Sequence, residues 1–402
     1  GTFWLLELSD SGLKIVGRYG EVGSPDGPPV ALRLGDGVVG AAFVSREGRL
    51  LLWRDGSLRE ADLGTPLSPL TAPSPVDLGR PGTHELIAVG KDGGLLLIGG
   101  LPTAPRIVAH VAVNALPDAR IAIGDLDRDG VPEAVILTDP TGRYSHGVLG
   151  DHLEAGSVTA VEVRPFGLDV KGRYSLPSTA VFEDLSPILA DIVGDGRPAV
   201  LLVKSYLKRG ATVTALGWEQ HRFVPVAEAP AIGRPKRWSH LVGVADLDND
   251  IVLEVLTVQT PHIGGVLKAY RRKDGTLAPV ARARGFSSHA AGSRNLEQAV
   301  IADLDGNGRP EVILPRGRDA LAAIEEGFKR AWSAIRDGHL TTLIAAVVLY
   351  WFSSSFIRGF ALTLSVGVIL SLFTAITVTR VYMKNVIAWR WARNPTLFGL
   401  KK

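Results

Sequence analysis

Three short acidic segments share a spacing that suits a hard cation. They read DLDRDGVPE at residues 125–133, DLDNDIVLE at residues 246–254 and DLDGNGRPE at residues 303–311. Carboxylates at the first, third and fifth positions, a backbone carbonyl at the seventh and an acid at the ninth can form an oxygen cage of Ca²⁺ size. A glycine at the sixth position permits the sharp turn that such a cage needs. The pattern therefore predicts calcium bound by loops.

The predicted ligands follow directly from this spacing. In the first loop they are Asp125, Asp127, Asp129, the carbonyl of Val131, and Glu133. In the last loop they are Asp303, Asp305, Asn307, the carbonyl of Arg309, and Glu311. A doubtful third set is Asp246, Asp248, Asp250 and Glu254, because Ile251 replaces the glycine. The ion would be structural, since it neutralises clustered carboxylates; the alternative is that Asp and Gly only make tight turns.

Other chemistry has little support in the sequence. The chain has no Cys, and its nine His form no paired metal motif. It also lacks a G-x-S-x-G elbow and a phosphate-binding glycine loop. Basic runs at residues 236–237 and 271–273 fall at expected turns of a net acidic region, which favours solvated loops over a nucleic-acid surface. We therefore expect neither an enzyme nor a nucleic-acid partner.

The acidic segments belong to a longer series of repeats. Weaker copies at residues 77–85 and 191–198 read as plain turns, and a relic begins near residue 36. Starts at 36, 77, 125, 191, 246 and 303 are separated by 41 to 66 residues, and an apolar run of strand length follows each unit. Propeller blades recur at roughly 40–50 residues. We predict an all-β propeller, with six blades favoured and seven possible, whose ring is closed by strands at residues 3–9 and 13–18.

Residues from about 30 to 315 resemble the FG-GAP/VCBS family on these repeated acidic loops. The resemblance implies a calcium-binding β-propeller, as in integrin α-subunit heads, that binds an unknown protein or glycan ligand. The loops depart from that family at the ninth position, where Glu133 and Glu311 stand in place of the usual Asp.

The C-terminal fifth of the chain has a different composition. Residues 321–402 contain ten Lys and Arg but only three Asp and Glu, against 34 and 38 before them. No charged residue lies in 340–357 or in 359–379. A bilayer core needs roughly 17–25 apolar residues in a helix, so we predict transmembrane helices at about 334–353 and 359–380. The alternative is a pair of helices buried in a soluble core.

Cations flank the predicted hairpin on both sides, and only Arg358 lies between its helices. Because cations stay on the cytoplasmic side, both ends of the hairpin should face the cytoplasm. The predicted division is a propeller at 1–315 and a membrane segment at 316–402 that ends in a basic cytoplasmic tail. The charge pattern leaves the side of the propeller open.

Segments 322–332, 340–346 and 358–368 closely resemble the last two transmembrane helices of SecD, over about residues 320–402. SecD is an accessory subunit of the bacterial Sec protein-export machinery, and its sister SecF is the nearest competitor. The resemblance implies the bacterial inner membrane, a lipid environment and other Sec subunits as partners. The family's earlier helices, its periplasmic domain and its intramembrane acid have no counterpart here, so this chain alone should not couple to protons.

Two functions therefore remain open. In one, a SecD-related membrane protein carries a propeller as an interaction domain and lacks the proton-coupling helices. In the other, a calcium-binding propeller is a binding or adhesion scaffold and the hairpin is its membrane anchor. The abrupt join near residue 315 also fits a fusion of two reading frames or an assembly artefact.

Overall fold

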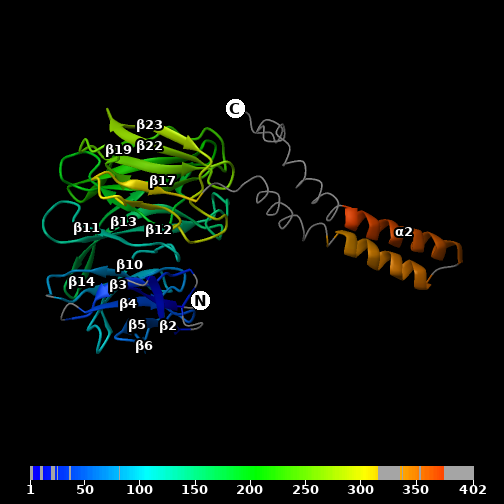
Figure 1. The fold of residues 1–402 in the computed structure, drawn as a ribbon, viewed down its shortest axis with the longest axis horizontal. Coiled ribbons are helices and arrows are strands. Elements are labelled where there is room, and N and C mark those ends of the chain that lie inside the picture. The colour runs from blue at the N-terminus through cyan, green and yellow to red at the C-terminus, as the bar shows by residue number, and fades with distance from the viewer. Residues whose placement is uncertain are drawn as a thin grey trace. The chain divides into compact units, whose positions relative to one another are not determined.

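The computed structural model describes residues 3–9, 12–19, 23–24, 26–35, 38–80, 82–315, 336, 338–352 and 355–374. The chain divides into two compact units, Gly1–Pro315 and Arg316–Lys402, which we call the β unit and the helical unit. Figure 1 shows strands throughout the described β unit and coiled ribbons in the helical unit.

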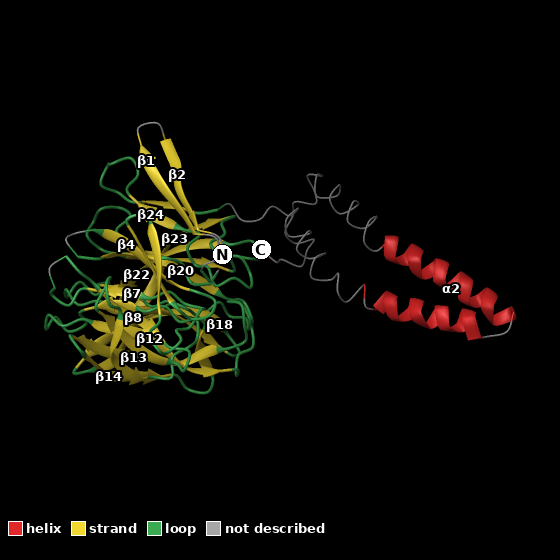
Figure 2. Ribbon diagram, turned by 90° about the horizontal axis from the view of Figure 1, so that it is seen from below, coloured by secondary structure: helices red, strands yellow, loops and turns green. Residues whose placement is uncertain are grey.

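The β unit begins with a hairpin and two antiparallel four-stranded sheets (Figure 2). The hairpin pairs β1 (Phe3–Ser9) with β2 (Gly12–Tyr19). The first sheet contains β3 (Val30–Arg33), β4 (Val39–Val44), β5 (Leu50–Arg54) and β6 (Ser57–Ala61). The second contains β7 (Ser74–Val76), β8 (Glu85–Val89), β9 (Gly94–Gly99) and β10 (Arg106–Ala112). In both sheets each strand pairs with its neighbour in sequence, as in a meander.

A 13-stranded sheet follows, built from three further meanders. The first has β11 (Ala122–Gly124), β12 (Glu133–Thr141), β13 (Glu154–Arg164) and β14 (Gly167–Ser175). The second has β15 (Ala180–Phe182), β16 (Ile188–Ala190), β17 (Ala199–Tyr206), β18 (Gly210–Glu219) and β19 (Arg222–Glu228). The third has β20 (Ser239–Ala245), β21 (Glu254–Gln259), β22 (Val266–Lys273) and β23 (Thr276–Arg284). Single residue pairs join the meanders, Ala155 with Phe182 and Glu228 with Thr276.

The last strands of the unit are β24 (Val300–Ala302) and β25 (Glu311–Ile313). The strands predicted at 3–9 and 13–18 are present as β1 and β2. In the described pairing, however, β1 pairs only with β2, and β24 pairs only with β25. The strand pairing therefore establishes a mostly β-sheet unit, whereas the closed ring of six or seven blades is not established by it.

The core of the β unit consists of strands that are apolar along their whole length. Every residue of β8 and β9 is buried, and the apolar run 134–137 in β12 is completely inaccessible to solvent. Such continuous burial indicates that both faces of these strands are covered, which is why they lack the alternating pattern of a half-exposed strand.

In the helical unit, residues 338–352 are helical and α2 spans Ser355–Phe373. Within the described residues, neither helix combines the length and the apolar character needed to cross a bilayer. The two predicted spans are thus not confirmed, and their outer ends at 334–335 and 375–380 lie outside the described residues. The resemblance segment 322–332 and the basic tail also lie outside them.

Candidate cation loops and the helical groove

The acidic repeats occupy one recurring position in the β unit. Loop 125–133 joins β11 to β12, loop 246–254 joins β20 to β21, and loop 303–311 joins β24 to β25. The weaker copies at 77–85 and 191–198 join β7 to β8 and β16 to β17. The sequence repeat therefore marks the turn after the first strand of its group, except at 191–198, where β15 precedes β16 in the second meander.

Loop 125–133 is folded around the carboxylate of Asp125. Its Oδ1 accepts hydrogen bonds from the backbone N–H groups of Arg128 at 2.6 Å and Asp129 at 3.1 Å, and its Oδ2 accepts one from Gly130 at 2.8 Å. Gly130 has a φ of 85°, a conformation that favours glycine. These bonds are those of a tight turn and form without a metal.

The same loop brings several carboxylates together, and Nδ1 of His221 lies 3.9 Å from Oδ2 of Asp127. Ligand oxygens of Asp125, Asp127 and Glu133 lie within 4.8 Å of one another. Oδ1 of Asp127 is buried without a hydrogen-bond partner. Burial, reinforced by the charges of Asp127, Asp125 and Asp129, raises the pKa of Glu133 to about 7, although the N–H of Leu126 donates to it. An orphaned oxygen among crowded carboxylates fits a divalent cation.

One predicted carboxylate ligand of this loop, Asp129, lies outside that group. Asp129 accepts a hydrogen bond from the N–H of Val131 at 2.7 Å, which closes the turn. The three carboxylates that converge are therefore those at the first, third and ninth positions of the repeat.

Loop 303–311 repeats this arrangement in a more exposed setting. Asp303 accepts the N–H groups of Gly306 and Gly308 at 2.8 and 2.9 Å, and Glu311 accepts that of Leu304 at 2.8 Å. Asp303, Asp305 and Glu311 converge as a possible metal-binding group. The side-chain oxygen of Asn307 accepts a hydrogen bond from the N–H of Arg309 at 2.8 Å.

Loop 246–254 has a similar backbone but a different charge balance. Asp246, Asp248 and Asp250 converge, and Ile251 adopts a φ of 75° where the other loops have glycine. Arg271 of β22 reaches into the loop and forms ion pairs with Asp248 at 2.7 Å and Asp250 at 2.9 Å. It also hydrogen-bonds Glu254. A solvated basic run was the sequence-based interpretation of Arg271, and these contacts contradict it.

The weaker copies behave as the turns that the sequence predicts. Asp191 accepts three backbone N–H groups of its loop, and Asp195 pairs with Arg197 at 2.7 Å. Asp77 accepts the N–H of Gly79 at 2.9 Å. Neither loop is among the converging acidic groups of the described residues.

A buried histidine cluster was not foreseen as a group. Trp238 stacks on His240 and His262, with ring centroids 5.5 and 5.9 Å away. His289 donates from Nε2 to the carbonyl of Ser293 at 2.9 Å, so its Nδ1 accepts from Nε2 of His262 at 2.9 Å. Burial, together with the neighbouring His289 and His262, lowers the pKa of His240 to about 3. His240 is therefore neutral at physiological pH.

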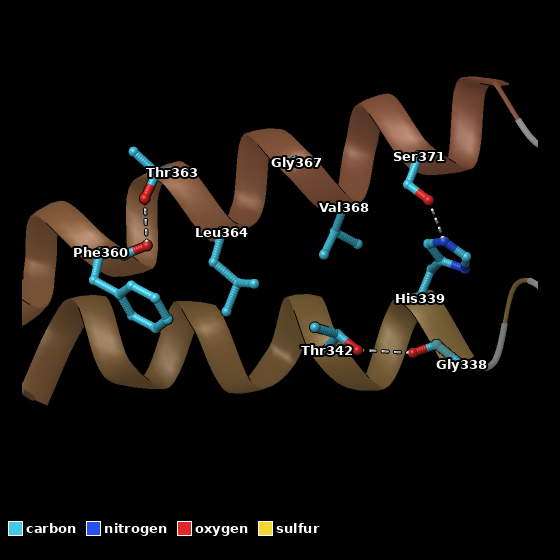
Figure 3. A pocket seen from close by; sticks show the side chains of 9 residues that line it. All are labelled: Gly338, His339, Thr342, Phe360, Thr363, Leu364, Gly367, Val368 and Ser371. Carbon is cyan, nitrogen blue, oxygen red and sulfur yellow. Dashed lines mark hydrogen bonds between the residues drawn. The ribbon is translucent and has the colours of Figure 1, made fainter.

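In the helical unit, a groove of about 630 Å³ runs between the two helices (Figure 3). It is lined by Gly338, His339, Thr342, Phe360, Thr363, Leu364, Gly367, Val368 and Ser371. His339 hydrogen-bonds Ser371 across the groove at 3.3 Å. The sequence has no Asp or Glu after residue 337, so the groove has no carboxylate that could relay protons.

Part of the chain is similar in sequence to known proteins. It is 47% identical over 93 residues to the protein translocase subunit SecD of Thermobaculum terrenum, which covers 22% of this chain and 18% of that protein. It is 54% identical over 71 residues to SecD of Magnetococcus marinus, covering 18% of this chain and 14% of that protein. For SecD of Acidaminococcus fermentans, the identity is 42% over 88 residues, covering 22% and 21%.

The chain is thus homologous to SecD over about a fifth of its length, and it spans about a fifth or less of these relatives. No family profile matches it. Among solved structures, an arginine-to-alanine mutant of AofleA from Arthrobotrys oligospora aligns with a TM-score of 0.39 and 13% identity. That alignment covers 68% of this chain and 78% of the other, and at this TM-score it supports no conclusion about function.

Proposed function

We propose that the chain is a SecD-related protein of the bacterial inner membrane whose helical unit packs beside other Sec translocon subunits. The observation that carries this proposal is the 42–54% identity to SecD subunits. The β unit would then be an interaction domain attached to a partial SecD. Because the helical unit has no acidic residue after residue 337, its role would be docking rather than proton coupling.

The surface of the helical unit supports a lipid environment. Among its described residues only Ala346 and Ala361 are buried, whereas Trp351 and Phe352 are 73% and 86% exposed. Other large apolar side chains are also exposed, namely Leu340, Ile344, Val347, Val348, Ile357, Phe360, Leu362, Val366, Ile369 and Leu370. An apolar surface of this extent needs lipid or other helices to cover it.

For the β unit we propose a propeller with six blades. Its strand groups follow one another along the chain. In each group an acidic or relic loop joins two strands near the start of the group. The first strand of one group contacts the first strand of the next group: β3 contacts β7, and β7 contacts β11. A pocket of about 290 Å³ is lined by residues at the start of these first strands, Val30 of β3 and Ser74 of β7, and by Arg120 just before β11. A ring of radial sheets around one axis would produce these contacts.

Calcium is the cofactor we propose for loops 125–133 and 303–311. The orphaned oxygen of Asp127 and the crowding around Glu133 support it in the first loop. In the last loop the support is the convergence of Asp303, Asp305 and Glu311. The ion would hold a hairpin turn and would leave the chain without catalytic chemistry.

Affinity purification of the tagged full chain from bacterial membranes in mild detergent tests the Sec assignment. We expect other Sec translocon subunits to co-purify in fixed proportion. Gly367→Leu would fill the groove, because an added Cβ there meets no described atom within 4 Å apart from its chain neighbours and the backbone of its own helix turns. We expect the filled groove to reduce the recovery of the Sec subunits that pack into it. Val366→Leu on the exposed face of α2 is the matched control.

Recovery of the chain from membranes without any Sec subunit would contradict that assignment. That result would favour the second candidate, a membrane-anchored calcium-binding scaffold whose β unit carries the function. The repeated acidic loops of the β unit are the specific feature in favour of that candidate.

A further inference from the structure

Arg271 occupies the centre of an acidic loop that the repeat pattern offers to a metal. It lies on β22, and Val255 pairs with Tyr270, so Glu254 and Arg271 are the next residues across from each other. Its Nη2 contacts Asp248 at 2.7 Å, its Nη1 contacts Asp250 at 2.9 Å, and its Nε bonds Glu254. Three carboxylates of one loop are therefore held by one guanidinium.

The equivalent position beside loop 125–133 carries the opposite charge. There Glu133 pairs across the sheet with Glu162. Glu162 is held by Arg164 at 2.7 Å and Lys171 at 3.2 Å. In the described part of the chain, no Lys or Arg forms an ion pair with the loop's own acids, Asp125, Asp127 and Asp129.

We infer that Arg271 is the built-in cation of loop 246–254, and that the residue across from the ninth position decides which loop takes a divalent ion. Arginine opposite Glu254 makes its loop independent of metal, whereas glutamate opposite Glu133 leaves its loop open to one. The part of this inference that concerns loop 125–133 rests on the calcium proposal above, while the part that concerns loop 246–254 does not.

Charge and geometry both support this exclusion. The guanidinium is always charged and presents planar donors that match carboxylates, so it can satisfy several of them at once. A divalent ion needs the same oxygens and would be repelled by the guanidinium a few ångströms away. Arg271 and a bound metal are therefore alternatives. The side chain of Arg271 is 25% exposed, so its removal would leave room for hydrated ions to reach the loop.

The first test uses the full chain in detergent with Asp127→Ala and Asp305→Ala, so that the two intact loops no longer bind calcium. In this background Arg271→Gln should add one calcium site per chain by equilibrium dialysis. Its melting temperature should fall by several degrees in chelator and recover in calcium. Arg271→Lys, which keeps the charge, should add no site and serves as the matched control.

The reverse test places arginine in the open loop of the native chain. Glu162→Arg should remove one bound calcium and lower the calcium-induced rise in melting temperature, whereas Glu162→Gln, which loses only the negative charge, should keep the site. In the first test, the inference would be overturned if Arg271→Gln in the Asp127→Ala and Asp305→Ala background bound no calcium and melted at the same temperature in chelator and in calcium. A native chain that binds no calcium would refute the calcium proposal alone. The first test would still show whether removal of Arg271 creates a calcium site in loop 246–254.

Discussion

The two units of this chain differ in how far their large apolar side chains are buried. In the β unit, Phe182 is completely buried and most residues of the neighbouring β13 and β17 are buried, so this unit forms its own core. In the helical unit, Trp351, Phe352 and Phe360 are mostly exposed. The difference indicates that the β unit buries a large apolar core by itself, whereas the described helices leave most of their apolar side chains uncovered within this chain. Five predictions test this comparison.

The largest expected effect is on fractionation. We expect the full chain to sediment with bacterial membranes and to resist extraction by alkaline carbonate. A chain ending at Pro315 should remain in the soluble fraction, because it lacks the exposed apolar helices. Circular dichroism of the shorter chain would check that its strands have formed. Equal distribution of both folded proteins would remove the contrast between the units.

Truncation of the buried ring of Phe182 tests the self-sufficient core. Phe182→Ala leaves a cavity in a cluster with no solvent access, so the free energy of unfolding should fall by about 3–5 kcal/mol. Denaturant unfolding of the full chain in detergent measures this loss. Phe360→Ala in the helical unit, where the ring is 58% exposed, should leave unfolding of the β unit unchanged.

Calcium should stabilise the β unit and leave the helical unit unaffected. At calcium tenfold above its dissociation constant, each bound loop adds about 1.4 kcal/mol. Asp127→Ala with Asp305→Ala should abolish the calcium-dependent rise in melting temperature. Asp169→Ala, an exposed aspartate on β14, is the control and should keep it. If calcium does not raise the melting temperature of the parent protein, the acids of these loops only stabilise tight turns.

Acid should weaken the β unit through His240. In the unfolded chain this side chain takes up a proton near pH 6.5, whereas burial in the folded state lowers its pKa to about 3. The unfolded state therefore binds more protons below pH 6.5, and stability falls by about 2 kcal/mol between pH 6.5 and 5. His240→Asn should flatten this slope in denaturant titrations. Val280→Ala, a non-titrating change at an exposed position of β23, should leave it unchanged.

Local patterns predicted much of the β unit. The strands at 3–9 and 13–18, the apolar run after each acidic loop and the turns at 77–85 and 191–198 all follow from short-range spacing and composition. The convergence of Asp125, Asp127 and Glu133 also follows, because one tight turn brings these residues together. Such features depend on neighbours within a few residues, which a single sequence displays.

The features that were missed depend on distant residues. Arg271 reaches Asp248 through a cross-strand register that its own neighbours do not reveal. The histidine cluster joins positions 240, 262 and 289, which three separate segments bring together. The ring closure predicted from residues 3–9 and 13–18 also depends on distant residues. It stays a prediction, because among the described strands β1 pairs with β2 alone and β24 with β25 alone.

Cysteine accessibility tests the contrast between the two units most directly, since the native sequence contains no cysteine. Val366→Cys in α2 and Val280→Cys in β23 replace side chains that are 60% and 53% exposed in the isolated chain. In membrane fragments whose two faces are both accessible to reagent, and without detergent, a membrane-impermeant maleimide should label the cysteine at 280. It should not label the cysteine at 366. Detergent denaturation should then make both react. Equal labelling of the two cysteines before detergent would contradict the account.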